Sequence, residues 1–233
     1  MPHERPHQYP INLELAGRRV LVVGGGNVGR HKIGAMLGAG AEVTVVATEI
    51  NDEIKARATV LSTSDLPGSL TLIERPYETG DIDGHWLVLT CTNDRAVNHL
   101  VFVDAEAAGI WSNSADDPDN CAWTLPSVVR QGDLQLTAST RGRSPAMSMW
   151  LRRRFEQEFD ERYAAVLDVL AEVRAEARST FGTSEIKGWI DGLESGAADL
   201  ALAGDIDAAR THLREAIGLA PTHATSHTAG AVQ

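Results

Sequence analysis

The chain has 233 residues, of which 43% are hydrophobic, and its formal net charge is -11 at pH 7. This length and apolar content are sufficient for a buried core, so we expect a globular protein. The negative charge argues against a protein that binds nucleic acid through a generally basic surface.

Neither the composition nor the start of the chain indicates a membrane or export signal. No apolar run reaches the roughly 18–20 residues that a membrane-spanning helix needs, and the opening MPHERPHQYP has no apolar signal-peptide core. We therefore expect a cytoplasmic protein that does not contact a membrane. The two cysteines, Cys91 and Cys121, lie far apart in the sequence, so we expect two reduced thiols and no cysteine-based metal site.

The first elements predict a βαβ unit. RRVLVVGGG is typical of a short strand that is buried on both faces. The next segment, NVGRHKIGAMLGAGA, predicts a helix with one buried face, formed by Val28, Ile33, Met36 and Leu37. AEVTVVA follows as a second, β-branched strand. A strand, a helix and a strand over about 30 residues indicate two parallel strands with a crossover helix.

The alternation continues to residue 115. We expect a helix near 49–58, strands near 70–74 and 86–92, an amphipathic helix in DRAVNHLVFVDAEAAG and a short strand in IWSNS. The predicted fold class is α/β, with a Rossmann-like, doubly wound and mostly parallel sheet.

A different organisation follows the turn cluster DDPDN. CAWTLPSVVRQGDLQLTAST predicts a hairpin, and the sequence from Ser144 onward is mostly helical. Four regions are expected: a dinucleotide-binding domain at 1–115, a small α+β module at 116–150, a C-terminal helical domain at 151–220 and a loose tail at 221–233.

Gly24-x-Gly26-x-x-Gly29 has the spacing of a dinucleotide-binding turn, and it lies between a predicted strand and a predicted helix. In such a turn the helix N-terminus offers free N–H groups to the pyrophosphate. The alternative is a glycine-rich connection that binds no nucleotide. The context favours the nucleotide, and the predicted cofactor-binding residues here are Gly24, Gly25, Gly26, Asn27, Val28 and Gly29.

The ribose end of this predicted site is less typical. Ala47 and Thr48 stand where an acidic ribose ligand is often found, and Glu49 is the nearest carboxylate. No arginine stands there to favour a 2′-phosphate either. The ribose site alone therefore leaves the choice between NAD and NADP open.

Three segments in this order resemble the precorrin-2 dehydrogenase family of sirohaem biosynthesis: YPINLELAGRRVLVVGGGNVGRHK, TNDRAVNHLV and NSADDPDNCAWTLPSVVRQGDLQLTASTRGRSPAMSMWLRRRFE. The family includes the N-terminal part of sirohaem synthase. The resemblance implies NAD-dependent oxidation of precorrin-2 to sirohydrochlorin, and some members also insert ferrous iron to give sirohaem. It also implies a homodimer that pairs through the middle module, here a dimerisation module, and through the C-terminal helices.

The resemblance assigns a catalytic role to Asp116, just after the last strand of the predicted sheet. A carboxylate at that edge could accept a proton as hydride leaves the substrate. The alternative is a turn former, because Asp-Asp-Pro is good turn chemistry by itself. The resemblance further places Thr92 and Asn93 on the nicotinamide side of the cofactor, and Thr48 and Glu49 on the adenosine side.

The predicted substrate side combines Asn113 with the segment between the hairpin and the next helix. That segment offers backbone amides and two guanidinium groups, which suit the many carboxylates of precorrin-2. An ordinary helix start capped by Ser144 before Pro145 is compatible with this role. The predicted substrate-binding residues are Asn113, Ser139, Thr140, Arg141, Gly142, Arg143 and Ser144, and no metal ligands are predicted.

A second class of function fits the predicted fold. A Rossmann domain can bind NAD to regulate a partner without any catalysis, and such a module needs neither Asp116 nor the arginine-bearing loop.

Overall fold

The computed structural model describes residues 7–115, 117 and 120–219, and it divides the chain into two compact units, Met1–Leu125 and Pro126–Gln233. Asp116 and the predicted tail 221–233 lie outside the described residues. Within the described ranges, no helix is both long and apolar enough to cross a membrane.

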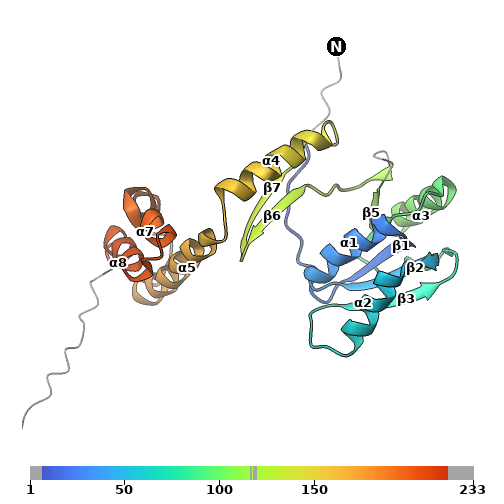
Figure 1. The fold of residues 1–233 in the computed structure, drawn as a ribbon, viewed down its shortest axis with the longest axis horizontal. Helices are drawn as coiled ribbons and strands as arrows, with labels where there is room; N and C mark the ends of the chain where they lie inside the picture. The colour runs from blue at the N-terminus through green and yellow to red at the C-terminus, as the bar shows by residue number, and fades with distance from the viewer. Residues whose placement is uncertain (1–6, 116, 118–119, 220–233) are drawn as a thin grey trace, which may run out of the picture. The chain divides into compact units, whose positions relative to one another are not determined.

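The first unit is built on a parallel sheet of five strands in the order β3-β2-β1-β4-β5 (Figure 1). Its strands are β1 (Arg19–Gly25), β2 (Glu42–Ile50), β3 (Ser69–Glu74), β4 (Leu87–Thr90) and β5 (Trp111–Ser114). Its helices are α1 (Asn27–Gly38), α2 (Asp52–Ser62) and α3 (Arg95–Ala108). The predicted Rossmann-like sheet is confirmed, and the strand order reverses between β1 and β4, where such folds bind ligands.

The central strand β1 is buried on both faces, as its apolar run predicts. Val20 and Val22 belong to the core under α1 and α2, whereas Leu21 and Val23 belong to the core under α3. All four side chains are at most 2% exposed. The two helical layers therefore hold β1 rigidly, and with it the glycine turn at its end.

Two local predictions in this unit are wrong. Strand β2 continues to Ile50 and α2 begins at Asp52, whereas the sequence predicts a helix from residue 49. The helix begins later because the Asn51 side chain caps it by accepting a hydrogen bond from the Glu53 N–H. Val28 is 47% exposed, unlike the other residues predicted on its face, because it lies in the first turn of α1, at the open edge of the sheet.

The segment after β5 folds back onto the first unit. The Ala122 N–H donates to the Ser112 carbonyl at 2.9 Å, and the Trp123 indole N–H donates to the Trp111 carbonyl at 3.3 Å. The described part of this turn is thus anchored along β5.

The second unit begins with an antiparallel hairpin and continues with helices (Figure 1). The elements are β6 (Ser127–Gln131), β7 (Leu134–Ala138), α4 (Pro145–Glu158), α5 (Arg162–Phe181), α6 (Trp189–Gly192), the π-helical turn η2 (Leu193–Ala197), α7 (Ala198–Leu202) and α8 (Ile206–Ala216). Helix α4 packs on the hairpin, whereas α5 to α8 form a separate core. A further division of this unit near residue 150 stays a prediction.

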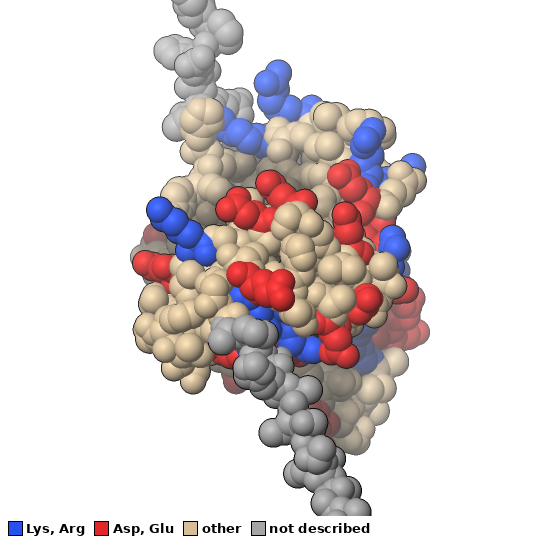
Figure 2. All heavy atoms as spheres, turned by 90° about the vertical axis from the view of Figure 1, so that its left-hand side faces the viewer, with Lys and Arg blue, Asp and Glu red and all other residues tan. Residues whose placement is uncertain are grey.

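Charged side chains are distributed over one face of the C-terminal helices. Figure 2 shows Asp and Glu spread over the face viewed there, with Lys and Arg between them. Some of these charges join helices, since Arg210 on α8 pairs with Glu172 on α5 at 2.7 Å and Arg214 pairs with Glu176. These pairs link α5 to α8 around the apolar core.

His85 is a buried histidine in the loop before β4. It is 6% exposed, and its Nδ1 lies 3.2 Å from the Ile82 carbonyl oxygen. Burial lowers the pKa of this imidazole below its ordinary 6.5, and the nearby positive charge of Arg19 lowers it further. The folded protein therefore holds His85 in its neutral form at neutral pH.

This burial predicts a pH dependence of stability. The contribution of neutral His85 is fully present above its unfolded-state pKa of 6.5, and it is lost as the pH falls below that value, because the unfolded chain binds the proton more readily. Urea unfolding at about pH 7.5 and about pH 5.5 should show a smaller loss of unfolding free energy in His85→Gln than in the wild type. An equal loss in both proteins would contradict the prediction.

Candidate functional site

The glycine turn ends β1 at the carboxyl edge of the sheet. Gly24 has φ +117°, a conformation that favours glycine. A Cβ atom on Gly24 would lie 2.6 Å from the Cys91 carbonyl oxygen and 3.0 Å from the Thr92 nitrogen. The turn therefore lies directly against the end of β4, which brings it next to Thr92.

The start of α1 has the properties of an anion site. Gly26 is the N-cap residue, no side chain caps the helix, and the first turn holds no acidic residue. A Cβ on Gly26 would meet nothing within 4 Å, so its outer side is open, whereas a Cβ on Gly29 would lie 2.5 Å from the Gly24 carbonyl oxygen. Free N–H groups and the positive end of the helix dipole face this open side. Asn27 and Val28 form the first turn beside it.

The carboxyl end of β2 forms the neighbouring edge of the site. Thr48 and Glu49 are exposed there, and the Glu49 carbonyl oxygen would lie 2.5 Å from a Cβ on Gly25. The Asn51 N–H donates to the Gly25 carbonyl at 2.9 Å, which ties the turn to the start of α2. The structure thus brings the predicted adenosine-side residues next to the glycine turn.

A hydrogen-bond network shapes the loop after β4. The Thr92 hydroxyl lies 3.0 Å from Asn98 Oδ1 and accepts from the Asp94 N–H at 3.0 Å, while Asn98 Nδ2 donates to the Thr92 carbonyl at 3.1 Å. Asp94 caps α3 by accepting from the Ala96 and Val97 N–H groups. The loop borders a hollow of about 500 Å³, which is lined by Thr92, Asn93, Arg95, Asn98 and Asp117.

The end of β5 carries the remaining predicted residues of the first unit. Asn113 is 7% exposed, and its Nδ2 donates to the Trp123 carbonyl at 2.8 Å, so the structure gives it a partner within the fold. Its role toward a substrate stays a prediction. Asp117 accepts a hydrogen bond from Asn120 Nδ2 at 3.0 Å, which is typical of a turn residue, although it also lines the hollow. Asp116 lies outside the described residues.

The predicted anion loop lies in the second unit, between β7 and α4. The Ser144 side chain caps α4 by accepting from the Met147 N–H at 3.1 Å, and the Thr140 hydroxyl bridges the loop by accepting from the Ser144 N–H at 3.2 Å. Arg141 has φ +57°, which a residue with a side chain rarely adopts, and Gly142 follows with φ +73°. Both arginines, Arg141 and Arg143, are exposed. The Arg141 N–H lies 3.4 Å from the Ser139 hydroxyl.

The comparison of the sequence with family models identifies the first unit. A model for NAD(P)-binding domains matches residues 11–127, just over half of the 233-residue chain. The chain belongs to this NAD(P)-binding family. The match covers the glycine turn, the loop after β4 and the segment after β5.

Curated relatives of this family carry the name siroheme synthase. The protein of Methylococcus capsulatus is 34% identical over 209 residues, which are 89% of this chain and 43% of the relative. Siroheme synthase 1 of Aeromonas salmonicida is 32% identical over 174 residues, which are 75% of this chain and 36% of the relative. The chain thus spans about two fifths of the length of these relatives.

A solved structure named "SirC, precorrin-2 dehydrogenase" has the same fold. It superposes with a TM-score of 0.67 at 24% sequence identity, over 89% of this chain and all of that chain. This match shows a shared fold, and together with the siroheme synthase relatives it supports the family resemblance predicted from the sequence.

Three residues that the sequence analysis did not assign lie at this candidate site. Asn98 fixes the loop after β4, Arg95 lines the hollow, and Asn51 ties the turn to α2. The spacing of Thr92, Asp94 and Asn98 could have indicated the first, since a polar residue one turn after a helix cap can reach back to the loop. The other two depend on contacts between distant segments.

Proposed function

We propose that the chain is an NAD-dependent precorrin-2 dehydrogenase, which oxidises precorrin-2 to sirohydrochlorin. The observation that carries the proposal is the uncapped, open start of α1 beside the Gly24–Gly29 turn, in a chain whose relatives are named siroheme synthases. A cytoplasmic location is part of this proposal.

The residues of the first unit fit a dinucleotide. The Gly24–Gly29 turn would hold the pyrophosphate, because Gly26 leaves its outer side open. Glu49 and Thr48 would face the adenosine ribose, and Thr92 with Asn93 the nicotinamide. The exposed Glu49 carboxylate can accept ribose hydroxyls, whereas Arg30 on α1 is already paired with Glu53. These groups favour NAD over NADP, whose 2′-phosphate a carboxylate repels.

The proposed reaction removes a hydride and a proton from precorrin-2. The bound nicotinamide would supply the hydride acceptor. Asp116 would accept the proton on its carboxylate, since in the sequence it comes two residues after the end of β5. The balance is then precorrin-2 and NAD to sirohydrochlorin, NADH and a proton.

The loop from Ser139 to Ser144 would bind substrate carboxylates. Its exposed arginines offer paired N–H donors, and the left-handed backbone at Arg141 is the kind of strain that binding sites retain. Asn113, at the end of β5, would also bind the substrate. Insertion of ferrous iron as a second substrate remains part of the prediction from the family.

Helix α4 supports the predicted homodimer. None of its residues is buried in the single chain, and its exposed side chains include Met147, Met149 and Trp150 at 44%, 51% and 50%. Apolar side chains gathered on one helix are typical of a surface that a second subunit covers.

A charge placed on this helix should weaken the dimer. We expect Met149→Glu to raise the dimer dissociation constant about tenfold or more, because a carboxylate would have to be buried in the interface. Analytical ultracentrifugation measures the change. The control is Val60→Glu, which places the same charge on the 56%-exposed Val60 of α2. A dimer equally stable in both variants would remove α4 from the interface.

The direct test of the proposed function is a turnover assay. Purified protein, precorrin-2 and NAD should give sirohydrochlorin, followed by its absorbance, and a parallel assay with NADP should be slower. NAD binding without turnover of correctly prepared substrate would reject the dehydrogenase and favour the NAD-sensing module. Added ferrous iron then tests for sirohaem formation separately.

A further inference from the structure

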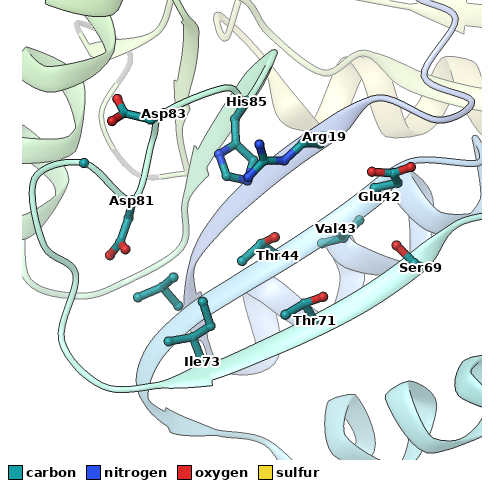
Figure 3. A pocket seen from close by; sticks show the side chains of 12 residues that line it. Arg19, Glu42, Val43, Thr44, Ser69, Thr71, Ile73, Asp81, Asp83 and His85 are labelled. Atoms are coloured by element: carbon teal, nitrogen blue, oxygen red, sulfur yellow. The ribbon is translucent and has the colours of Figure 1, made fainter.

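A second cavity lies in the first unit, on the face of the sheet opposite α1 and α2. Its volume is about 460 Å³, within the range of small-molecule sites. Arg19, Glu42 and Ser69, the first residues of β1, β2 and β3, line it together with the loop that carries Asp83 and His85 (Figure 3). The lining also includes Val46 on β2 and Ile73 on β3, so the cavity extends along the sheet toward the carboxyl ends of these strands.

The floor of the cavity is a polar strip on the sheet. Thr44 on β2 is the register partner of Thr71 on β3, and Glu42 is the partner of Ser69, so these side chains lie in two cross-strand pairs on one face. Figure 3 shows them along the floor of the cavity. This face lies opposite α1 and α2, while α3 packs on β4 and β5. The hydroxyl groups therefore remain available to a ligand.

His85 provides a second and independent sign of a ligand. Its Nδ1 is held by the Ile82 carbonyl, so Nδ1 carries the hydrogen and the neutral ring presents a lone pair at Nε2. Nε2 is buried, and within the described residues it has no hydrogen-bond partner. The ring lines the cavity (Figure 3). A buried acceptor of this kind requires a donor from a ligand or a water molecule.

The charges around the cavity select the class of ligand. Asp81 is neutralised by two hydrogen bonds from Arg75, at 2.6 and 2.8 Å. The other charged groups at the lining are the Arg19 guanidinium and the carboxylates of Glu42 and Asp83. Because two of these groups are negative and one is positive, the site offers little electrostatic attraction to an anionic ligand. The positive charge of Arg19 disfavours a cationic ligand. The hydroxyl groups of a ligand can both donate and accept hydrogen bonds. They can therefore donate to the carboxylates and to His85 Nε2, and accept from the guanidinium and the threonine hydroxyls.

We propose that this cavity is a second binding site, for a neutral polyhydroxylated compound of sugar size. Ligand hydroxyls donate to His85 Nε2 and to Asp83, and accept from Arg19 and from the hydroxyls of Thr44 and Thr71. No residue of this lining belongs to the hollow at Thr92 and Asn93, where the nicotinamide is proposed to bind.

The test follows the ¹⁵N resonance of His85 Nε2 in the full chain, identified by its loss in His85→Gln. D-glucose, D-ribose and sucrose are titrated separately, with and without saturating NAD. We expect at least one of them to shift the resonance saturably, on the order of millimolar, with and without NAD. Inorganic phosphate serves as the anionic probe and should leave the resonance in place.

Variants connect the shift to this cavity. The double variant T44V/T71V keeps β-branched side chains but removes two hydroxyls. It should raise the dissociation constant of the sugar about tenfold or more. Thr137→Val, on the exposed side of β7, is the matched control and should bind as the wild type does. Arg19→Met is a second test if the double variant does not fold, and it should also weaken binding of the sugar.

Three results would overturn the proposal. One is that no sugar moves the His85 resonance at concentrations far above millimolar. Another is that phosphate moves it as well as the sugars do. The third is that the variants at Thr44, Thr71 and Arg19 bind the sugar as tightly as Thr137→Val.

Discussion

Replacing Asp116 by alanine should lower the turnover of precorrin-2 on the order of 10²-fold or more, while the affinity for NAD stays almost unchanged. The reason is that the proposed general base would act in the chemical step, whereas the cofactor would be held at the glycine turn and at the ends of β2 and β4. Steady-state turnover and fluorescence titration with NAD measure the two effects separately.

The neighbouring Asp117 gives the matched comparison. Its carboxylate accepts from Asn120 Nδ2 at 3.0 Å, so its structural partner is known. Asp117→Asn should keep turnover within about tenfold of the wild type, because asparagine is also a good turn residue. Asp65→Asn, in an exposed loop, controls for the loss of one negative charge. Wild-type turnover in Asp116→Ala, or an equal loss in Asp117→Asn, would remove Asp116 from the proposed role of base.

Replacing Gly26 by alanine should weaken NAD binding tenfold or more and leave the free energy of unfolding nearly unchanged. The folded chain has room for this methyl group, since a Cβ on Gly26 meets nothing within 4 Å and its φ of -84° suits alanine. The methyl group would, however, occupy the side from which the pyrophosphate approaches the helix N-terminus. Isothermal titration with NAD and urea unfolding give the two quantities.

Substitutions at two other glycines of the first unit serve as comparisons. Gly38→Ala, on α1 with open space around it, should bind NAD normally. Gly24→Ala should lose both stability and binding, because its Cβ would lie 2.6 Å from the Cys91 carbonyl oxygen. If Gly26→Ala binds NAD as the wild type does, the pyrophosphate does not lie against this turn.

Local sequence signals were sufficient for much of the first unit. The apolar run of β1, the glycine spacing and the helix after it are neighbours in the chain, so their pattern predicts the strand, the turn and the helix together. The exact helix start was not predictable with the same certainty. The strand continues to Ile50 because Ile50 pairs with Gly25 of β1, and the helix then begins after its cap residue Asn51.

The candidate site was predictable where it depends on one segment and unpredictable where distant segments meet. The glycine turn and the loop of Thr92 and Asn93 could be named from motifs. The Asn113 side chain donates a hydrogen bond to the Trp123 carbonyl, and this contact depends on a segment that folds back along β5. Val28 is exposed because it lies at the open edge of the sheet. Helical periodicity alone does not predict where that edge lies.

The sequence by itself determined the class of the fold and the strand, glycine turn and helix with which it begins, because these depend on residues close together in the chain. Only the tertiary structure decided which side chains share a surface. The cross-strand pairing of Thr44 with Thr71 and the burial of His85 beside Arg19 arise from a parallel sheet that joins residues far apart in sequence. Strand register and helix packing set such contacts, and no local pattern records them.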